Sequence, residues 1–106
     1  AVTIPNLTLS NPSYVHVDNA GAIFILDTSN YRVVRWANTI VTVVAGGRGN
    51  GGSLSQLGVS HGMHVDAGNN LYIAEASNHR VTLWTNGNAN LSQVVSVFAV
   101  NVFLFD

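Results

Sequence analysis

The chain repeats itself once, and this internal repeat limits the folds that are open to it. An offset of 48 residues superimposes the segment 9–36 on the segment 57–84 without a gap. Several residues are identical in the two copies: His16 and His64, Val17 and Val65, Ile25 and Ile73, Asn30 and Asn78, Arg32 and Arg80, Trp36 and Trp84. Repeats of about 40 to 50 residues are typical of proteins in which each unit leaves an apolar face for its neighbour to cover.

Each unit contains four short apolar segments separated by turns. We expect strands over 14–18, 23–26, 31–36 and 40–45 in the first unit, and over 63–66, 71–74, 79–84 and 94–98 in the second. Val, Ile, Phe and Tyr favour strands, and the Asn- and Gly-containing turns between these segments favour antiparallel hairpins. Helical periodicity is not found, so the sequence predicts an all-β fold.

Four-stranded units at this period are typical of β-propeller blades. The segment from Val65 to Val81, which contains Asn78-His79-Arg80 after its second strand, resembles the NHL repeat. The segment 41–57 is similar to the stretch that joins two blades in that family. The resemblance covers about residues 9–98 and implies two four-stranded antiparallel blades. We assign 1–49 to the first blade with an N-terminal strand, and 50–106 to a linker and the second blade with a C-terminal strand.

The sequence also departs from the family pattern at three places. Tyr31 stands where the second unit has His79, and Ser60 stands where the first unit has Pro12. The apolar tail Ala99–Asp106 does not read as part of a third blade, so the strand that would close a ring is not identified.

The predicted strands are apolar on both faces, and this predicts assembly. Segments 23–26, 41–45 and 71–74 lack the alternation of a sheet with one solvated face. Two blades bury one interface and leave roughly several hundred Å² of apolar surface on their outer faces. Head-to-tail repetition around an axis would cover both faces and close a ring. Because NHL-like propellers frequently have six blades, we favour a homotrimer over a dimer or a tetramer; a fragment of a longer propeller is the alternative.

His61 is the candidate metal ligand. It lies in Ser60-His61-Gly62, before the innermost strand of the second unit. This segment is similar to the Pro-His-Gly segment that holds zinc in the peptidyl-hydroxyglycine amidating lyases, which are NHL-like propellers. The resemblance implies three His61 side chains around the axis of a trimer, an arrangement that suits catalytic zinc in a lyase or hydrolase. Ser60 replaces the proline, and Ser13 takes the place of His61 in the first unit, so we favour a solvated channel histidine and no cofactor.

The other candidate residues recur in both units, which favours structural roles. Turn or ion-pair roles are predicted for Asp18, Asp27, Arg32, Asp66, Glu75 and Arg80. Packing between blades is predicted for His16, Trp36, His64 and Trp84. General acids, calcium ligands and sugar-stacking tryptophans are the alternatives. His79 is expected at the surface. The Gly-rich segment 46–52 lacks the end of a phosphate-binding loop and is predicted to be a flexible connection.

Charge and composition exclude several classes of partner. Four arginines, no lysine and a net charge of −1 cannot supply the positive field that nucleic acids require. Cysteine is absent, which excludes disulfides and thiolate sites. No apolar run reaches the ~18 residues of a membrane span, and no leader peptide is recognised, so we expect a soluble protein of undetermined location. The predicted function is a self-assembling binding or scaffold module, without evident catalysis. Its partners are copies of itself and, as an alternative, a protein, peptide or glycan bound by the loops.

Overall fold

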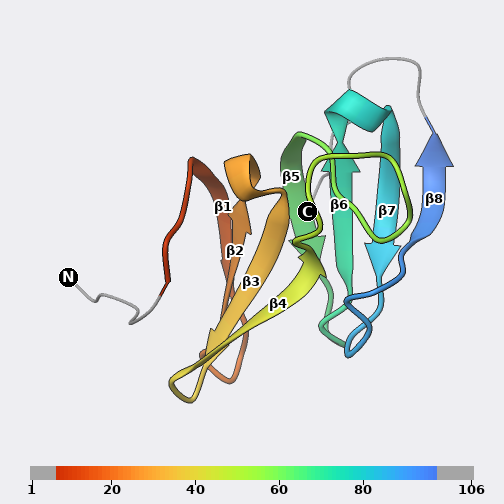
Figure 1. Cartoon of the computed structure of the whole chain (residues 1–106). Coiled ribbons are helices and arrows are strands. Elements are labelled where there is room, and N and C mark those ends of the chain that lie inside the picture. The colour runs from red at the N-terminus through yellow and green to blue at the C-terminus, as the bar shows by residue number, and fades with distance from the viewer. Residues whose placement is uncertain (1–6, 98–106) are drawn as a thin grey trace.

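The computed structural model describes residues 7–97, which form two four-stranded antiparallel sheets (Figure 1). The first sheet contains β1 (Pro12–Val17), β2 (Ile23–Asp27), β3 (Arg32–Ala37) and β4 (Ile40–Gly46). The second contains β5 (Ser60–Val65), β6 (Leu71–Glu75), β7 (Arg80–Trp84) and β8 (Gln93–Val97). In both sheets the strand order follows the chain order, so the all-β, antiparallel prediction is confirmed. Within the described residues, no helix is long and apolar enough to cross a membrane.

The strand boundaries differ from the predicted ones where the chain turns. Tyr31 and His79 were expected to begin the third strand of each unit, and this prediction is wrong. Each ends a one-turn 3-10 helix, η1 (Thr28–Asn30) or η2 (Ala76–Asn78), with a left-handed φ of 53° or 52°. This conformation reverses the chain so that the following arginine pairs with the last residue of the preceding strand. Phe98, predicted to end the last strand, lies outside the described residues.

The two sheets pack side by side (Figure 1). Strand β1 of the first sheet contacts β5 of the second. The facing surfaces of the two sheets, which we call the inner faces, form one apolar core. The first sheet contributes Phe24, Leu26 and Val33, and the second contributes Met63, Ile73 and Trp84, all fully buried. Full burial of each such side chain stabilises the fold by about 1.5–3 kcal/mol.

The surface of the first sheet that points away from the second, its outer face, is also apolar. Residues paired across antiparallel strands lie on the same face, and two such rows cross this sheet. The rows are Val15–Ile25–Val34–Val43 and Val17–Ile23–Trp36–Val41. Val15 is 62% exposed, and Val17 and Val43 are exposed as well, whereas Ile25 and Val34 in the middle of these rows are buried.

The outer face of the second sheet carries a separate small cluster. Ala74 and Val81 are buried there and pack with Tyr72. In the repeat, Tyr72 corresponds to Phe24, which lies on the inner face of the first sheet. Conversely, Ile73 lies on the inner face of the second sheet, and its counterpart Ile25 lies on the outer face of the first. A position that faces the interface in one sheet therefore faces away from it in the other.

Candidate functional site

A buried ion pair lies at the end of the second sheet where β6 turns into β7. Glu75 is the last residue of β6 and is fully buried, and its Oε1 lies 3.0 Å from Nη2 of Arg80. Oε2 accepts a 2.6 Å hydrogen bond from the hydroxyl of Thr82. The side-chain amide of Asn78 and the backbone N–H of Gly58 also donate to Oε1, at 2.9 and 3.2 Å. The buried carboxylate is thus satisfied on both oxygens.

Arg80 also holds the segment that precedes its own sheet. It donates to the backbone carbonyls of Gly52 at 2.8 Å, Ser53 at 3.2 Å and Gln56 at 3.4 Å. Asn78 donates to the carbonyl of Gly51 at 2.9 Å. We call residues 47–59, between β4 and β5, the connecting segment. Within the segment 46–52, which was predicted to be a flexible connection, the carbonyls of Gly51 and Gly52 are bound by the amide of Asn78 and the guanidinium of Arg80.

The first sheet has the same arrangement with a shorter acid. Nε of Arg32 lies 2.8 Å from Oδ2 of Asp27, and the side-chain amide of Asn30 donates to the same oxygen at 2.8 Å. Oδ1 of Asp27 accepts from the backbone N–H of Ser10 at 2.7 Å. Arg32 donates to the carbonyl of Thr8 at 2.9 Å, the position that corresponds to Gln56. The side chain of Arg32 is 24% exposed, against 9% for Arg80.

Asp18 and Asp66 fasten the turns after β1 and β5. Oδ1 of Asp18 accepts from the backbone N–H groups of Ala20 and Ala22, each at 2.9 Å. Oδ1 of Asp66 accepts from those of Gly68 and Asn70, also at 2.9 Å. These bonds, above all those from Ala22 and Asn70, hold the pKa of both carboxyls below the ordinary value of 3.8. The roles as turn residues predicted from the repeat match this geometry.

The lowered pKa values predict a loss of stability in acid. A carboxyl whose pKa is lower in the folded state contributes stability that is present above 3.8 and is lost as the pH falls through the folded-state value. We expect Asp66→Asn to reduce this acid loss, because the amide oxygen still accepts from the turn but does not titrate. The check is the free energy of unfolding in urea at about pH 5 and about pH 3. An equal loss in both proteins would contradict the assignment.

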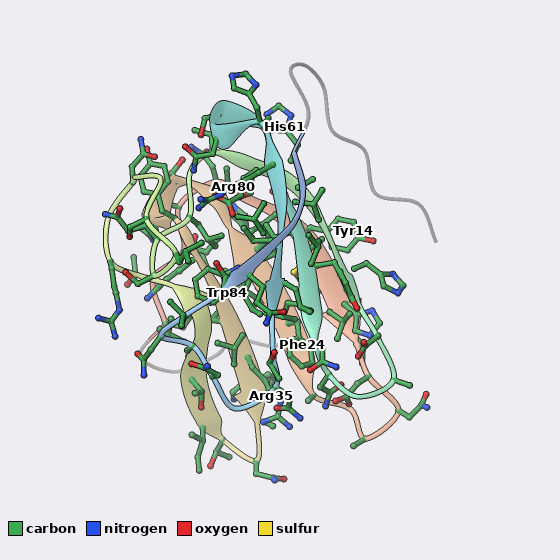
Figure 2. The ribbon with its side chains drawn as sticks, turned by 90° about the vertical axis from the view of Figure 1, so that its right-hand side faces the viewer. Tyr14, Phe24, Arg35, His61, Arg80 and Trp84 are labelled. Carbon is green, nitrogen blue, oxygen red and sulfur yellow. The ribbon has the colours of Figure 1, made fainter. Side chains whose placement is uncertain are left out.

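The four histidines do not come together within one chain. His61 is exposed near the start of β5, at the end of the molecule opposite Arg35 (Figure 2). The ring of His16 lies 6.1 Å from that of Phe24, His64 lies on the outer face of the second sheet, and His79 is exposed in its turn. Among residues 7–97, no group of three or more His, Cys, Asp or Glu side chains could hold a metal ion. A three-histidine site therefore requires several copies of the chain.

The two tryptophans occupy different environments, although they are repeat equivalents. Trp84 is fully buried between the sheets, and its Nε1 donates to Thr82 Oγ1 at 3.0 Å. Trp36 lies on the outer face of the first sheet, and its Nε1 is buried without a hydrogen-bond acceptor in the described residues. The counterpart of Thr82 is Val34, which explains the missing acceptor. Of the pair predicted to pack between blades, only Trp84 does so within the chain.

A pocket between the sheets contains a residue that sequence analysis did not single out. It lies where β3 and β4 approach the turns before β6 and after β7, and we call it the Arg35 pocket. Its wall includes Phe24, Arg35, Val44, Asn69, Leu71 and Asn86. Figure 2 shows Arg35 next to Phe24 at this end of the molecule. Val33, Arg35 and Ala37 alternate onto the inner face of β3, but the sequence alone does not show which face of β3 meets the other sheet.

The chain matches no family model and no curated protein. Within residues 7–97, the features that bear on function are the two outer faces and the Arg35 pocket.

Proposed function

We propose that the chain is a two-blade, NHL-like unit that joins further copies head to tail in a closed β-propeller, and that the ring serves as a binding or scaffold module. The observation that carries this proposal is the exchange of faces between the two repeats. The interface inside the chain joins one side of the first sheet to the opposite side of the second. The inner face of the first sheet therefore has its repeat equivalent on the outer face of the second sheet. The inner face of the second sheet likewise has its equivalent on the outer face of the first.

The unpaired counterparts are chemically similar to the paired ones. On the first sheet, Ile25 and Trp36 correspond to Ile73 and Trp84, which are buried in the interface. On the second sheet, Tyr72 and Val81 correspond to Phe24 and Val33; Tyr72 is partly buried and Val81 is already buried within the single chain. A second copy that set its second sheet against this first sheet would repeat the internal interface with nearly the same residue types.

Such a contact is heterologous, and its repetition closes a ring when a whole number of its rotations makes a full turn. Covering roughly 400 Å² of apolar surface at about 25 cal/mol per Å² contributes on the order of 10 kcal/mol before the cost of association. Two blades per chain allow four, six or eight blades, and the resemblance to six-bladed propellers favours the trimer. Loops at the ends of the strands would then surround a shared channel and offer a surface to peptide or glycan ligands.

The mass in solution tests the proposal. We expect light scattering after size-exclusion chromatography to give close to three times the 11.2 kDa of one chain. The substitution Val15→Glu, which places a charge on the outer face of β1, is expected to yield a folded monomer, because a buried unpaired carboxylate is costly at an interface.

Ile40→Glu is the matched control. Ile40 is 63% exposed, nearly the same as Val15 at 62%, but it pairs with Ala37 and so lies on the other side of its sheet. This variant should keep the mass of the parent. A monomeric parent protein, or a Val15→Glu variant that assembles like the parent, would show that the outer face does not bind a second copy.

A further inference from the structure

Arg35 differs from the other three arginines in what its guanidinium contacts. Arg32 and Arg80 bind carboxylates and backbone carbonyls, and Arg48 donates to the side chain of Asn90. Cζ of Arg35 lies 5.8 Å from the centroid of the Phe24 ring, and its guanidinium has no hydrogen-bond acceptor within residues 7–97. It therefore brings up to five unused N–H donors to the wall of the pocket.

The nearby carboxylate does not neutralise Arg35 directly. Asp18 feels its charge, since Arg35 contributes to lowering the pKa of Asp18, but the two form no ion pair within 4.0 Å. Asp18 is already used by its own turn, and its second oxygen accepts from the side chain of Asn69 at 3.4 Å. The turn acid is thus held away from the guanidinium, and the charge of Arg35 remains available in the pocket.

The same position carries an apolar residue in the other repeat. Leu83 is the counterpart of Arg35, so the fold does not require a cation at this point of the third strand. Arg35 is only partly buried on the inner face, so its charge is incompletely shielded from water. The compensation for this charge that the described residues supply is the face of Phe24, and a cation over an aromatic ring at an exposed site gains only about 0.5–1 kcal/mol.

The remaining walls indicate the kind of molecule that would fit. Leu71, Val44 and Phe24 are apolar residues of the wall. Asn69 and Asn86 also line the wall, with side-chain amides that donate to Asp18 and to the carbonyl of Gly68. A planar guanidinium binds carboxylates through two parallel N–H···O bonds. We propose that the Arg35 pocket binds a small carboxylate carried on a short apolar stem, with the carboxylate on Arg35 and the stem against Leu71 and Val44.

The site is independent of ring assembly, because all of its residues belong to one chain. The test is a titration of the isotope-labelled full chain with butyrate, followed by NMR through the Nε–H of Arg35 and the indole N–H of Trp84. We expect both signals to shift and to saturate with a Kd on the order of 1–10 mM, which is ordinary for a ligand of a few heavy atoms. Butyramide, which has the same size but no charge, should leave both signals in place.

Two variants and one control complete the experiment. Arg35→Leu, which introduces the residue found at the equivalent position of the other repeat, should weaken binding at least about tenfold. Arg35→Lys should weaken binding several-fold, because an ammonium group cannot form two parallel hydrogen bonds to a carboxylate. Arg48→Leu removes an arginine outside the pocket and should bind like the parent. N-acetylvaline tests a peptide C-terminus as the source of the carboxylate: tighter binding than butyrate identifies a peptide, and weaker binding a free acid.

Three results would overturn the proposal. They are no shift of either signal at tens of millimolar ligand, equal shifts with butyramide, and unchanged affinity in both Arg35 variants. Since a monomer carries the complete pocket, binding without assembly would refute the ring and leave the pocket intact. Assembly without binding would do the reverse.

Discussion

Replacing Arg80 with methionine is expected to destabilise the protein by about 3–5 kcal/mol. The substitution leaves the fully buried carboxylate of Glu75 without its cation and removes the donors to the carbonyls of Gly52, Ser53 and Gln56. Methionine keeps most of the apolar part of the arginine side chain, so the loss of stability measures the contribution of the guanidinium group. The measurement is the free energy of unfolding in urea at a fixed protein concentration.

Arg32→Met is the control for this variant. Arg32 makes the equivalent pair with Asp27, but its side chain is more exposed, and it holds the carbonyl of Thr8 alone. Asp27 is as fully buried as Glu75, so its carboxylate also loses its cation, and only the smaller number of carbonyls held by Arg32 leads us to expect a smaller loss than for Arg80→Met. Equal losses would show that the connecting segment adds nothing to the role of Arg80.

Thr82→Val is expected to cost about 2–4 kcal/mol although valine is close to threonine in shape. The hydroxyl of Thr82 donates to Glu75 Oε2 at 2.6 Å and accepts from Trp84 Nε1 at 3.0 Å, and all three residues are fully buried. Valine would remove one partner from an acceptor and one from a donor that water does not reach. Thermal and urea unfolding of the variant, compared with the parent protein, measure this cost.

The reciprocal substitution, Val34→Thr, is the matched control. It places a hydroxyl at the same position of the first repeat, where the indole N–H of Trp36 has no acceptor in the described residues. We expect a change within about 1 kcal/mol of zero, since a new hydrogen bond offsets the burial of the hydroxyl. If both variants lower the free energy of unfolding equally, the hydrogen bonds of Thr82 do not stabilise the second sheet more than Val34 stabilises the first.

The strands could be predicted from the sequence because they depend on local signals. Short apolar segments and turn residues placed all eight within a few residues of their observed bounds. Tyr31 and His79 were wrongly assigned to strands for one reason. Both adopt a left-handed conformation, which a sequence indicates at glycine but not at tyrosine or histidine. The repeat helped with the ion pairs, because Asp27 and Glu75 each precede an arginine by the same five residues.

What the sequence could not predict depends on contacts between distant segments. The hydrogen bonds from Arg80 to the connecting segment join residues 24 to 28 positions apart, and no local pattern indicates them. The Arg35 pocket requires knowing that the inner face of β3 meets the turns of the other sheet. Trp36 and Trp84 looked alike in the repeat, and only the arrangement of the sheets separates them. Self-assembly stays a prediction, supported by the exchange of faces.

The hydrogen bonds between Arg80 and the connecting segment limit where a repeat of this kind can be cut when it is duplicated or lost. The second structural module does not begin with the first residue of β5, because Gly51, Gly52 and Gln56 are bound by side chains from beyond β6. A duplication or a graft that started at Ser60 would lack the three carbonyls of the connecting segment to which Arg80 donates, and would expose its guanidinium to water. A transferable piece of chain therefore begins no later than Gly51, so that Arg80 and the connecting segment that it holds are inherited together.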